Sequence, residues 1–494
     1  MKSNFLKNII PFVLLTGILF TGCIKEEEPI VPKIIPEANG VNRFVWTGLH
    51  DYYLWNKEVD GLSNTKYLKK DSLNEFLNHY TNPQDLFKAL LYQRGKVDKW
   101  SFLVDNSKDI DDWISGISET MGYDFMLSRI GQSNDLFGFV RYVYKGSPAE
   151  KAGMKRGDIF LKVNDLQLTV DNYSELLFST ISYKLSFATI TDNIVLPNDR
   201  AVNMTAVEMQ ENPIHLDTVF TINNQKVGYL VYNGFNADFD LQLNDVMQEF
   251  KSENISQMEL DLRYNGGGSV QSSIYLASML YGTDQSKLFA MAQYNEGVSA
   301  FLEEEYGADA LKDNFVTAIA KTDEHAGMPI NTLNLRKIYI LVSDNTASAS
   351  ELLINGLRPY MDVKVIGINT SGKYTGSITL KDEDDNGKPL SSWAMQPIVV
   401  KYANSQGVSD YVNGLTPDIV AEEDIARLMP FGDPNETLLK IALDDMQGIV
   451  ITAQTLKSAK MGLRKVTDSK ELKRFGKEMY INPEKFSNLK KEAE

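Results

Sequence analysis

Two segments of this chain carry residue types that together could cleave an amide bond. Small and hydroxyl-bearing residues fill Ser343–Glu351, which lies between an apolar stretch, Ile338–Val342, and a segment that starts like a helix. A strand-to-helix turn holds a hydroxyl at the carboxyl edge of a sheet, and the first N–H groups of the helix point toward any anion that forms there. The pattern therefore predicts a serine nucleophile in this turn.

A serine hydroxyl needs a neighbouring base, which is usually a histidine. None of the four histidines lies in a recognisable catalytic motif; they are His50, His79, His215 and His325. A lysine can take this role when burial lowers its pKa. Lys373 follows a second apolar stretch, Val363–Gly367, and two strands that end at one edge would bring it to the serine. We therefore predict a Ser-Lys pair.

At these residues the sequence resembles the carboxyl-terminal processing (tail-specific) proteases of the S41 family. The family's Ser-Ala-Ser-Ala-Ser-Glu-like motif is matched by Thr346–Glu351, and the resemblance places the nucleophile on Ser348. The family's lysine lies 25 positions later in a Gly-Lys pair, and Lys373 stands at that spacing. The resemblance implies a serine endopeptidase that uses no metal and no organic cofactor.

The resemblance extends to two further motifs. Asp261–Gly268 matches the family's Asp-Leu-Arg-x-Asn-x-Gly-Gly strand end, and Gly414–Asp418 matches its Gly-x-x-Pro-Asp signature. In the family a glycine amide of the first motif completes the oxyanion hole with the amide after the nucleophile. The resemblance therefore implies an oxyanion hole made by the N–H of Ala349 and the N–H of Gly267 or Gly268.

One position departs from the family pattern. Bacterial members commonly carry a glutamine four residues after the lysine, where it orients the amine, but this chain has Ser377 there. A serine hydroxyl can still make a hydrogen bond, although its side chain reaches less far. Ser377 is therefore the candidate third member of the catalytic group.

Each motif also has a purely structural interpretation. Serine-rich turns commonly cap helices, a lysine in a glycine-rich loop is usually solvated, and a glycine run often only permits a left-handed backbone. The acidic run Asp382–Gly387 opens like a calcium loop, but its twelfth position is Trp393 where a glutamate is needed. A hairpin turn is the preferred interpretation of that run, and no metal site is predicted.

The N-terminus has the features of a secretory signal. A basic start precedes a short apolar core, Ile9–Phe20, which is too short to span a bilayer stably. Phe20–Cys23 resembles a lipobox, which implies that Cys23, the only cysteine, is acylated. The proline-spaced stretch Pro29–Pro36 favours an extended tether. We therefore expect a lipid-anchored protein of the cell envelope, at the outer membrane on its periplasmic or surface face; an ordinary cleaved signal and a solvated linker are the alternatives.

Charge and composition narrow the range of partners. The 494 residues carry a formal net charge of −16, and no stretch rich in lysine and arginine is interleaved with aromatics. This balance argues against a nucleic-acid partner. The sequence makes no prediction of the oligomeric state.

A domain that binds peptides is predicted ahead of the catalytic motifs. Gly146–Asp165 closely resembles the helix and strand of a PDZ domain, which adds an extended C-terminus to a sheet edge and captures its carboxylate. Gly122, Tyr123 and Phe125 are the candidate carboxylate loop and strand, although Tyr123 and Asp124 depart from the usual apolar and glycine pattern. Protein or peptide substrates with free C-termini are the expected partners.

The predicted architecture is a multi-domain α/β fold. Aromatic and apolar residues at helical spacing after residue 41 indicate a helical N-terminal domain, and alternating strand and helix signals after residue 222 indicate a layered α/β sheet domain. The expected parts are a signal peptide (1–22), a lipid-anchored linker (23–40), the helical domain (41–108), the PDZ-like domain (111–209), the S41 peptidase domain (222–430) and a helical C-terminal segment (431–494).

These features lead to one favoured function and one alternative. The favoured function is an envelope serine endopeptidase with Ser-Lys catalysis, in which the PDZ-like domain helps to recognise C-terminal tails. The alternative is a non-catalytic lipoprotein that keeps the fold and only binds peptides or ligands, because a fold does not determine an activity. The intact spacing of Ser348 and Lys373 favours the enzyme.

Overall fold

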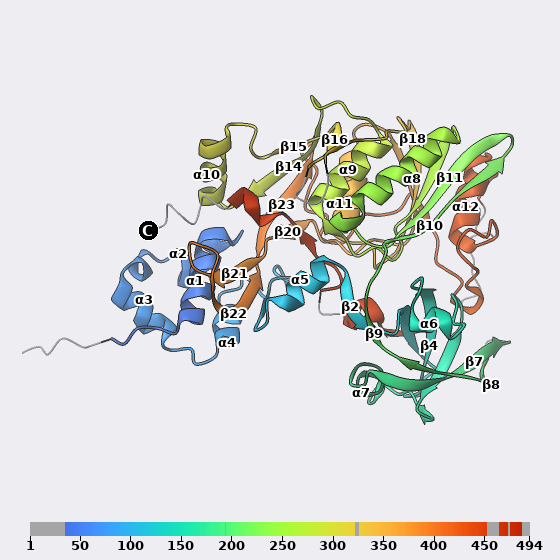
Figure 1. Cartoon of the computed structure of the whole chain (residues 1–494), viewed down its shortest axis with the longest axis horizontal. Helices are drawn as coiled ribbons and strands as arrows, with labels where there is room; N and C mark the ends of the chain where they lie inside the picture. Colours follow the sequence, from blue (N-terminus) through green and yellow to red (C-terminus); the bar gives the residue numbers. More distant parts are fainter. Residues whose placement is uncertain (1–34, 193, 322–325, 452–463, 473–474, 487–494) are drawn as a thin grey trace, which may run out of the picture.

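The computed structural model of the chain describes residues 35–192, 194–321, 326–451, 464–472 and 475–486. A helical region, a β-rich middle domain and a larger α/β domain follow one another along the chain (Figure 1). The predicted signal peptide, Cys23 and most of the linker lie outside the described residues. Among the described residues, none of the helices combines the length and the apolar character that a membrane crossing requires.

The N-terminal region is helical, as its periodicity predicts. Its helices are α1 (Gly40–Tyr52), α2 (Asp60–Ser63), α3 (Lys70–Leu77) and α4 (Pro83–Ala89). Trp46, Leu49 and Tyr52 are buried at helical spacing, which confirms that the aromatic stripe serves packing. These side chains belong to the same buried cluster as the strands of the α/β domain. The helical region therefore shares one hydrophobic core with the domain that carries the catalytic motifs.

The middle domain is built on an antiparallel sheet. Its strands, in sheet order, are β3 (Tyr123–Arg129), β4 (Leu136–Val143), β5 (Ile159–Val163), β7 (Ser182–Thr191) and β8 (Ile194–Thr205). The short helix α6 (Pro148–Lys151) is capped by the hydroxyl of Ser147, and α7 (Tyr173–Phe178) follows the short strand β6 (Leu166–Gln167). The connection to the next domain pairs β2 (Ile117–Thr120) with β9 (Val207–Gln210).

The α/β domain contains the sheet that positions the predicted nucleophile. Its strands, in sheet order, are β10 (Ile214–Ile222), β11 (Gln225–Tyr232), β12 (Gln257–Asp261), β18 (Lys337–Val342), β19 (Asp362–Gly367) and β24 (Ile419–Val420). From β11 to β24 the pairs are parallel, so the loops after β12, β18 and β19 leave the sheet at the same edge. Helices α8 (Asp240–Ser252), α9 (Val270–Leu280) and α11 (Ala349–Leu357) are part of this layered arrangement (Figure 1).

A second six-stranded sheet lies beside the first. Its strands, in sheet order, are β13 (Gly268–Ser269), β26 (Met479–Tyr480), β20 (Thr375–Ser377), β23 (Ile398–Asn404), β14 (Leu288–Tyr294) and β15 (Lys312–Asn314). The acidic run at residues 382–387 connects β21 (Leu380–Glu383) to β22 (Pro389–Gln396), which pair antiparallel. The hairpin predicted for that run is confirmed.

The described part of the C-terminal segment differs from the helical structure that the sequence suggests. It begins with the helix α12 (Thr437–Met446), but further on it contains two strands, β25 (Lys465–Asp468) and β26, and the short helices α13 (Ser469–Leu472) and η5 (Pro483–Phe486). The two strands join the middle-domain sheet and the second sheet respectively. Their extended conformation depends on strands far away in the sequence, so the local Lys/Glu-rich composition does not indicate it.

Candidate active site

The predicted nucleophile lies in the turn between β18 and α11. Ser348 has φ of 65° and ψ of −117°, a left-handed conformation that is rare for a residue with a side chain. Holding it there costs roughly 1–3 kcal/mol, and such strain gathers at functional sites. Ser348 is fully buried, and its Oγ makes no hydrogen bond within the described part of the chain. The hydroxyl is thus held in a fixed position with its bonding capacity unused.

The glycine motif lies directly against this turn. The Ala347 N–H donates to the carbonyl of Asn265 (3.1 Å). A Cβ added to Gly267, whose φ is 107°, would lie 2.5 Å from the Cβ of Ser348, so only glycine fits there. The Gly267 N–H donates to Oδ1 of Asn265 (2.9 Å). This amide, one of the two glycine amides considered for the oxyanion hole, therefore already has an acceptor. Gly268 lies in β13 and pairs with Met479 of β26, so the choice between Gly267 and Gly268 beside Ala349 stays a prediction. The N–H of Ala349 opens α11 without an intrahelical acceptor.

One buried carboxylate holds the backbones of both predicted catalytic residues. Oε2 of Glu351 accepts the N–H of Ser348 (2.9 Å) and the N–H of Lys373 (2.8 Å). Oε1 of Glu351 accepts the N–H of Gly372 (2.7 Å) and the hydroxyl of Thr370. Burial raises the pKa of Glu351, although these four hydrogen bonds act in the opposite direction. Glu351 stands in the sequence motif, yet its role as the link between the two loops becomes visible only in the structure.

The predicted base is fully buried. Nζ of Lys373 donates to Oε2 of Glu478 and lies 5.0 Å from the centroid of the Trp100 ring. Burial lowers the pKa of the Lys373 ammonium, while the negative charge of Glu478 raises it. Burial raises the pKa of Glu478 as well. A lysine with a lowered pKa can supply the free amine that a general base requires.

Ser377 lies near the lysine loop but is bonded elsewhere. Its Oγ donates to the carbonyl of Met479 (2.9 Å) and accepts from Nε2 of Gln396 (3.1 Å). The amine of Lys373 is instead bonded to Glu478, at the place predicted for the Ser377 hydroxyl. Sequence reasoning missed both Glu478 and Gln396, because neither stands in a motif. The part of Ser377 in catalysis stays a prediction.

The residues predicted to bind a peptide carboxylate lie at the start of the middle-domain sheet. Gly122 has φ of 79° and precedes β3, whose first residues are Tyr123 and Asp124. The hydroxyls of Tyr123 and Tyr183 are bonded to each other in the interior (2.6 Å). Asp124, which departs from the usual PDZ pattern, forms a buried ion pair with Arg141. The Phe125 N–H donates to Oγ of Ser469 (3.1 Å), a residue of the C-terminal segment.

A buried charge network joins the middle domain to the glycine motif. Arg156 of the middle domain donates to the hydroxyl of Tyr264 (2.9 Å) and to Glu423 (2.6 Å). Glu423 also accepts from Tyr264 (2.7 Å) and from Arg263 (2.8 Å). Tyr264 and Arg263 stand in the motif that ends at Gly268. Removing one member would leave a buried charge without its partner, so the network fixes the two domains to each other.

The fold and this site define a serine-type peptidase. Residues 226–421 match the model of Peptidase family S41, residues 40–102 match the Peptidase S41 N-terminal domain, and residues 139–180 match a PDZ domain. The chain belongs to the S41 family of serine peptidases, and the predicted order of helical region, PDZ domain and peptidase fold is confirmed.

Named relatives agree with this class. The chain is 24% identical over 425 residues to a Staphylococcus aureus (strain MRSA252) protein named "Probable CtpA-like serine protease". This alignment covers 83% of this chain and 75% of that protein. It is 26% identical over 296 residues to the carboxy-terminal processing protease CtpA of Bacillus subtilis (strain 168), covering 59% of this chain and 55% of that protein. A crystal structure from Bacteroides fragilis NCTC 9343, assigned to the S41 proteases, matches with a TM-score of 0.64 and 25% identity and covers 85% of this chain and all of that one.

Proposed function

We propose that this peptidase is an endopeptidase that cleaves polypeptides by Ser-Lys catalysis, with Ser348 as the nucleophile and Lys373 as the base. One observation carries the proposal: the same oxygen of Glu351 binds the backbone N–H groups of both residues. This shared acceptor fixes the nucleophile loop and the lysine loop relative to each other. Capping of helix α11 explains the bond from the Ser348 N–H, but it does not explain the bond from the Lys373 N–H, because Lys373 lies outside this helix.

The reaction then follows in two steps. The Oγ of Ser348 attacks the carbonyl carbon of the substrate, and its proton passes to the neutral amine of Lys373. The N–H of Ala349 and the N–H of Gly267 or Gly268 hold the oxyanion, and the Lys373 ammonium returns the proton to the leaving amine as the C–N bond breaks. A water molecule, deprotonated by Lys373, then attacks the acyl-enzyme and releases the acid, and the proton goes back to Ser348.

The PDZ domain provides the recognition of substrate tails in this proposal. PDZ domains bind an extended C-terminus by adding it to a sheet edge. The strand β3 starts at the proposed carboxylate loop of Gly122 and Tyr123 and continues through Phe125. Protein or peptide substrates with free C-termini are the proposed partners, and the domain limits expected from the sequence are retained as part of the proposal.

The location is a further part of the proposal. The resemblance of Phe20–Cys23 to a lipobox supports acylation of Cys23, and the stretch Pro29–Pro36 supports an extended tether. The enzyme is thus proposed to be a lipid-anchored protein of the cell envelope. A single acyl chain binds a membrane only weakly, so stable anchoring needs the several chains of a bacterial lipoprotein or a second contact.

The decisive experiment compares the natural chain with Ser348→Ala. The purified chain is incubated with casein, an unstructured protein, and the products are identified by mass spectrometry. We expect the natural chain to produce new internal termini and Ser348→Ala to lose several orders of magnitude in rate, as is usual when a nucleophile is removed. Cleavage by Ser348→Ala at the natural rate would show that another residue is the nucleophile. If the natural chain binds casein but leaves it intact under all conditions, the alternative of a binding lipoprotein is supported.

A further inference from the structure

The chain's own C-terminal segment runs past both proposed substrate-binding sites. We use "C-terminal segment" for the described residues 464–472 and 475–486. In Figure 1 it is drawn in red, and it passes from the middle domain to the second sheet of the peptidase domain. Its strand β25 adds to the edge of the middle-domain sheet, and its strand β26 lies between two strands of the second sheet; each of these sheets contains a proposed site.

The strand β26 lies in a slot of the peptidase domain. It pairs in parallel with β13 on one side and with β20 on the other, so it stands between Gly268 of the proposed oxyanion hole and Ser377. The Ile481 N–H donates to the carbonyl of Ser377 (3.0 Å). Without β26, the facing edges of β13 and β20 would expose unpaired backbone groups, which is the arrangement that binds an extended peptide.

The approach of the segment to the glycine motif is close. A Cβ added to Gly266 would lie 2.0 Å from the carbonyl oxygen of Gly476, so the two backbones meet with no room for a side chain. Lys477 donates through Nζ to the carbonyl of Asp344 (2.8 Å) and to Oγ of Ser371 (2.9 Å). These contacts attach the segment to the nucleophile loop and to the lysine loop.

Glu478 engages the amine that catalysis requires. Its Oε2 accepts from Nζ of Lys373, and both side chains are buried. An Nζ that is bonded to Glu478 is not bonded to the hydroxyl of Ser348, whose proton it would have to take. The hydroxyl of Ser348 makes no hydrogen bond in the described part of the chain, so the nucleophile and its base are not engaged with each other in this structure.

The other strand of the segment covers the free edge of the PDZ sheet. β25 pairs antiparallel with β3, with Lys465 opposite Ser128 and Asp468 opposite Met126. Oγ of Ser469 then accepts the N–H of Phe125 (3.1 Å) and donates to Asp124 (2.7 Å). The C-terminal direction of β25 therefore leads toward the proposed carboxylate loop, as a bound substrate tail would.

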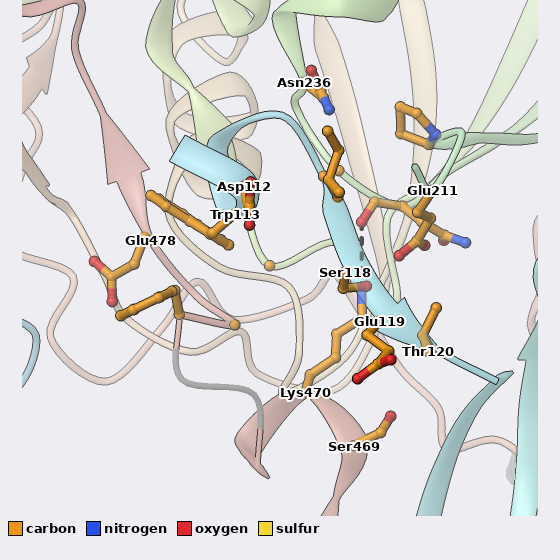
Figure 2. Close-up of a pocket in the computed structure, with 18 of the residues that line it drawn as sticks. Asp112, Trp113, Ser118, Glu119, Thr120, Glu211, Asn236, Ser469, Lys470 and Glu478 are labelled. Carbon is orange, nitrogen blue, oxygen red and sulfur yellow. Dashed lines mark hydrogen bonds between the residues drawn. The ribbon is translucent and has the colours of Figure 1, made fainter. Parts of the chain in front are cut away.

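A cavity of about 670 Å³ lies between these two sites. Its walls include residues 266–268 of the glycine motif and Ser469, Lys470, Gly476, Glu478 and Tyr480 of the C-terminal segment, but neither Ser348 nor Lys373. Figure 2 shows Ser469, Lys470 and Glu478 around this cavity, together with Trp113 and the strand β2. A peptide that enters the cavity would meet the C-terminal segment before it reaches the nucleophile.

We propose that the C-terminal segment is an intramolecular peptide ligand of its own enzyme, which occupies the PDZ edge at β3 and the catalytic slot between β13 and β20 and must leave before a substrate is cleaved. The inference rests on the proposed function of the same site. It predicts that the resting enzyme is self-inhibited, and that weakening the segment activates it.

The test uses full-length variants and casein as the substrate. Ile481→Pro removes the N–H that binds Ser377, and Val450→Pro is the control because Val450 is 80% exposed and lies outside the C-terminal segment. We expect Ile481→Pro to raise kcat/KM about tenfold, which corresponds to about 1.4 kcal/mol, and Val450→Pro to leave it unchanged. Glu478→Gln should also raise activity near neutral pH, because the amide cannot stabilise the ammonium as a carboxylate does.

A synthetic peptide provides the second measurement. The peptide of residues 464–486 should inhibit Ile481→Pro competitively, raising KM without changing kcat, whereas a scrambled peptide should not. A fluorescent form of the peptide should bind Ser348→Ala/Ile481→Pro at least tenfold more tightly than it binds Ser348→Ala alone, because the slot is vacated. This binding measurement requires no catalysis.

The outcomes separate the two proposals. If the natural chain and Ile481→Pro cleave casein equally, and the peptide binds neither Ser348→Ala nor Ser348→Ala/Ile481→Pro, the proposed self-inhibition is overturned. The proposed protease activity is then still supported. A fall in kcat of Glu478→Gln, without activation by Ile481→Pro, would likewise overturn it and make Glu478 a positioning residue. If no variant cleaves casein but the labelled peptide binds as expected, the segment is confirmed as a ligand and the proposed catalysis fails.

Discussion

Replacement of Glu351 by glutamine tests whether one carboxylate holds the catalytic pair. The side chain keeps its shape, but one of its two oxygen positions becomes an NH₂ group that can only donate. In the structure both oxygens accept two hydrogen bonds each, from Ser348 and Lys373 on one side and from Thr370 and Gly372 on the other. If the amide oxygen faces Ser348 and Lys373, their two bonds are kept and only the Gly372 bond is lost, because the Thr370 hydroxyl can turn to accept from the NH₂ group. In the opposite orientation the bonds from both Ser348 and Lys373 are lost.

The magnitude follows from these contacts. In the less disruptive orientation the Gly372 bond is lost, and the remaining bonds weaken because their partner is neutral, which together would destabilise the chain by about 3 kcal/mol. A neutral amide is easier to bury than a carboxylate, and the raised pKa of Glu351 reflects that burden. We therefore expect a net loss of about 2 kcal/mol in the free energy of unfolding. Because Gly372 directly precedes Lys373, loss of its bond lets the lysine loop shift. We therefore expect kcat to fall about 100-fold, as small misplacements of catalytic groups commonly cause, with KM little changed.

The assay combines urea unfolding, followed by tryptophan fluorescence, with steady-state cleavage of casein at a temperature where both proteins are folded. Glu150→Gln is the matched control. Glu150 is exposed and accepts a backbone N–H from Gly146 (2.6 Å) in the PDZ domain, so its loss should change stability by less than about 1 kcal/mol. If Glu351→Gln has the same unfolding midpoint and the same kcat as the natural chain, the reasoning is refuted. The four hydrogen bonds would then neither stabilise the fold nor position the catalytic loops.

Four further predictions concern the base, the third position and the anchor. Activity of the natural chain should rise with pH as Lys373 loses its proton, because burial lowers the pKa of this lysine while the charges of Glu478, Asp98 and Glu351 raise it. In Glu478→Gln the pH profile of kcat should show this rise at a lower pH. A profile that does not shift would contradict the assignment of Lys373 as the base. Lys373→Arg should be as inactive as Lys373→Ala, because arginine keeps its proton. Ser377→Ala should lower kcat with little change in KM if the hydroxyl helps to orient the amine, and full activity in the casein assay would make Ser377 structural. Cys23→Ser should move the protein from the detergent phase to the soluble envelope fraction or leave its signal uncleaved, and fractionation measures this. If the cleaved variant stays with the membrane as the natural protein does, another anchor holds it.

Short-range patterns in the sequence determine much of the fold and the identity of the candidate catalytic residues. The segment from Ile338 to Leu357 contains an apolar strand, a small-residue turn and a helix start, and these local signals place Ser348 at a sheet edge. Lys373 follows the neighbouring strand, and parallel strands end at the same edge, so the proximity of the two loops follows from the order of the elements. The aromatic stripe of α1 and the helix of the PDZ domain are likewise local, because each depends on a spacing of three or four residues.

Only the tertiary structure decides what surrounds these residues. Glu478 meets Lys373 across 105 positions of the chain, and no spacing in the sequence relates them. The strands β25 and β26 bind through their backbones to strands that are distant in sequence, so their side chains need no alternating pattern and the local composition suggested helix instead. The contacts of the two glycine amides are likewise set by the tertiary structure, because the Gly267 N–H donates to Asn265 and Gly268 pairs with Met479 of β26. Backbone pairing and buried charge partners are properties of the assembled fold, because they are set by where distant segments meet.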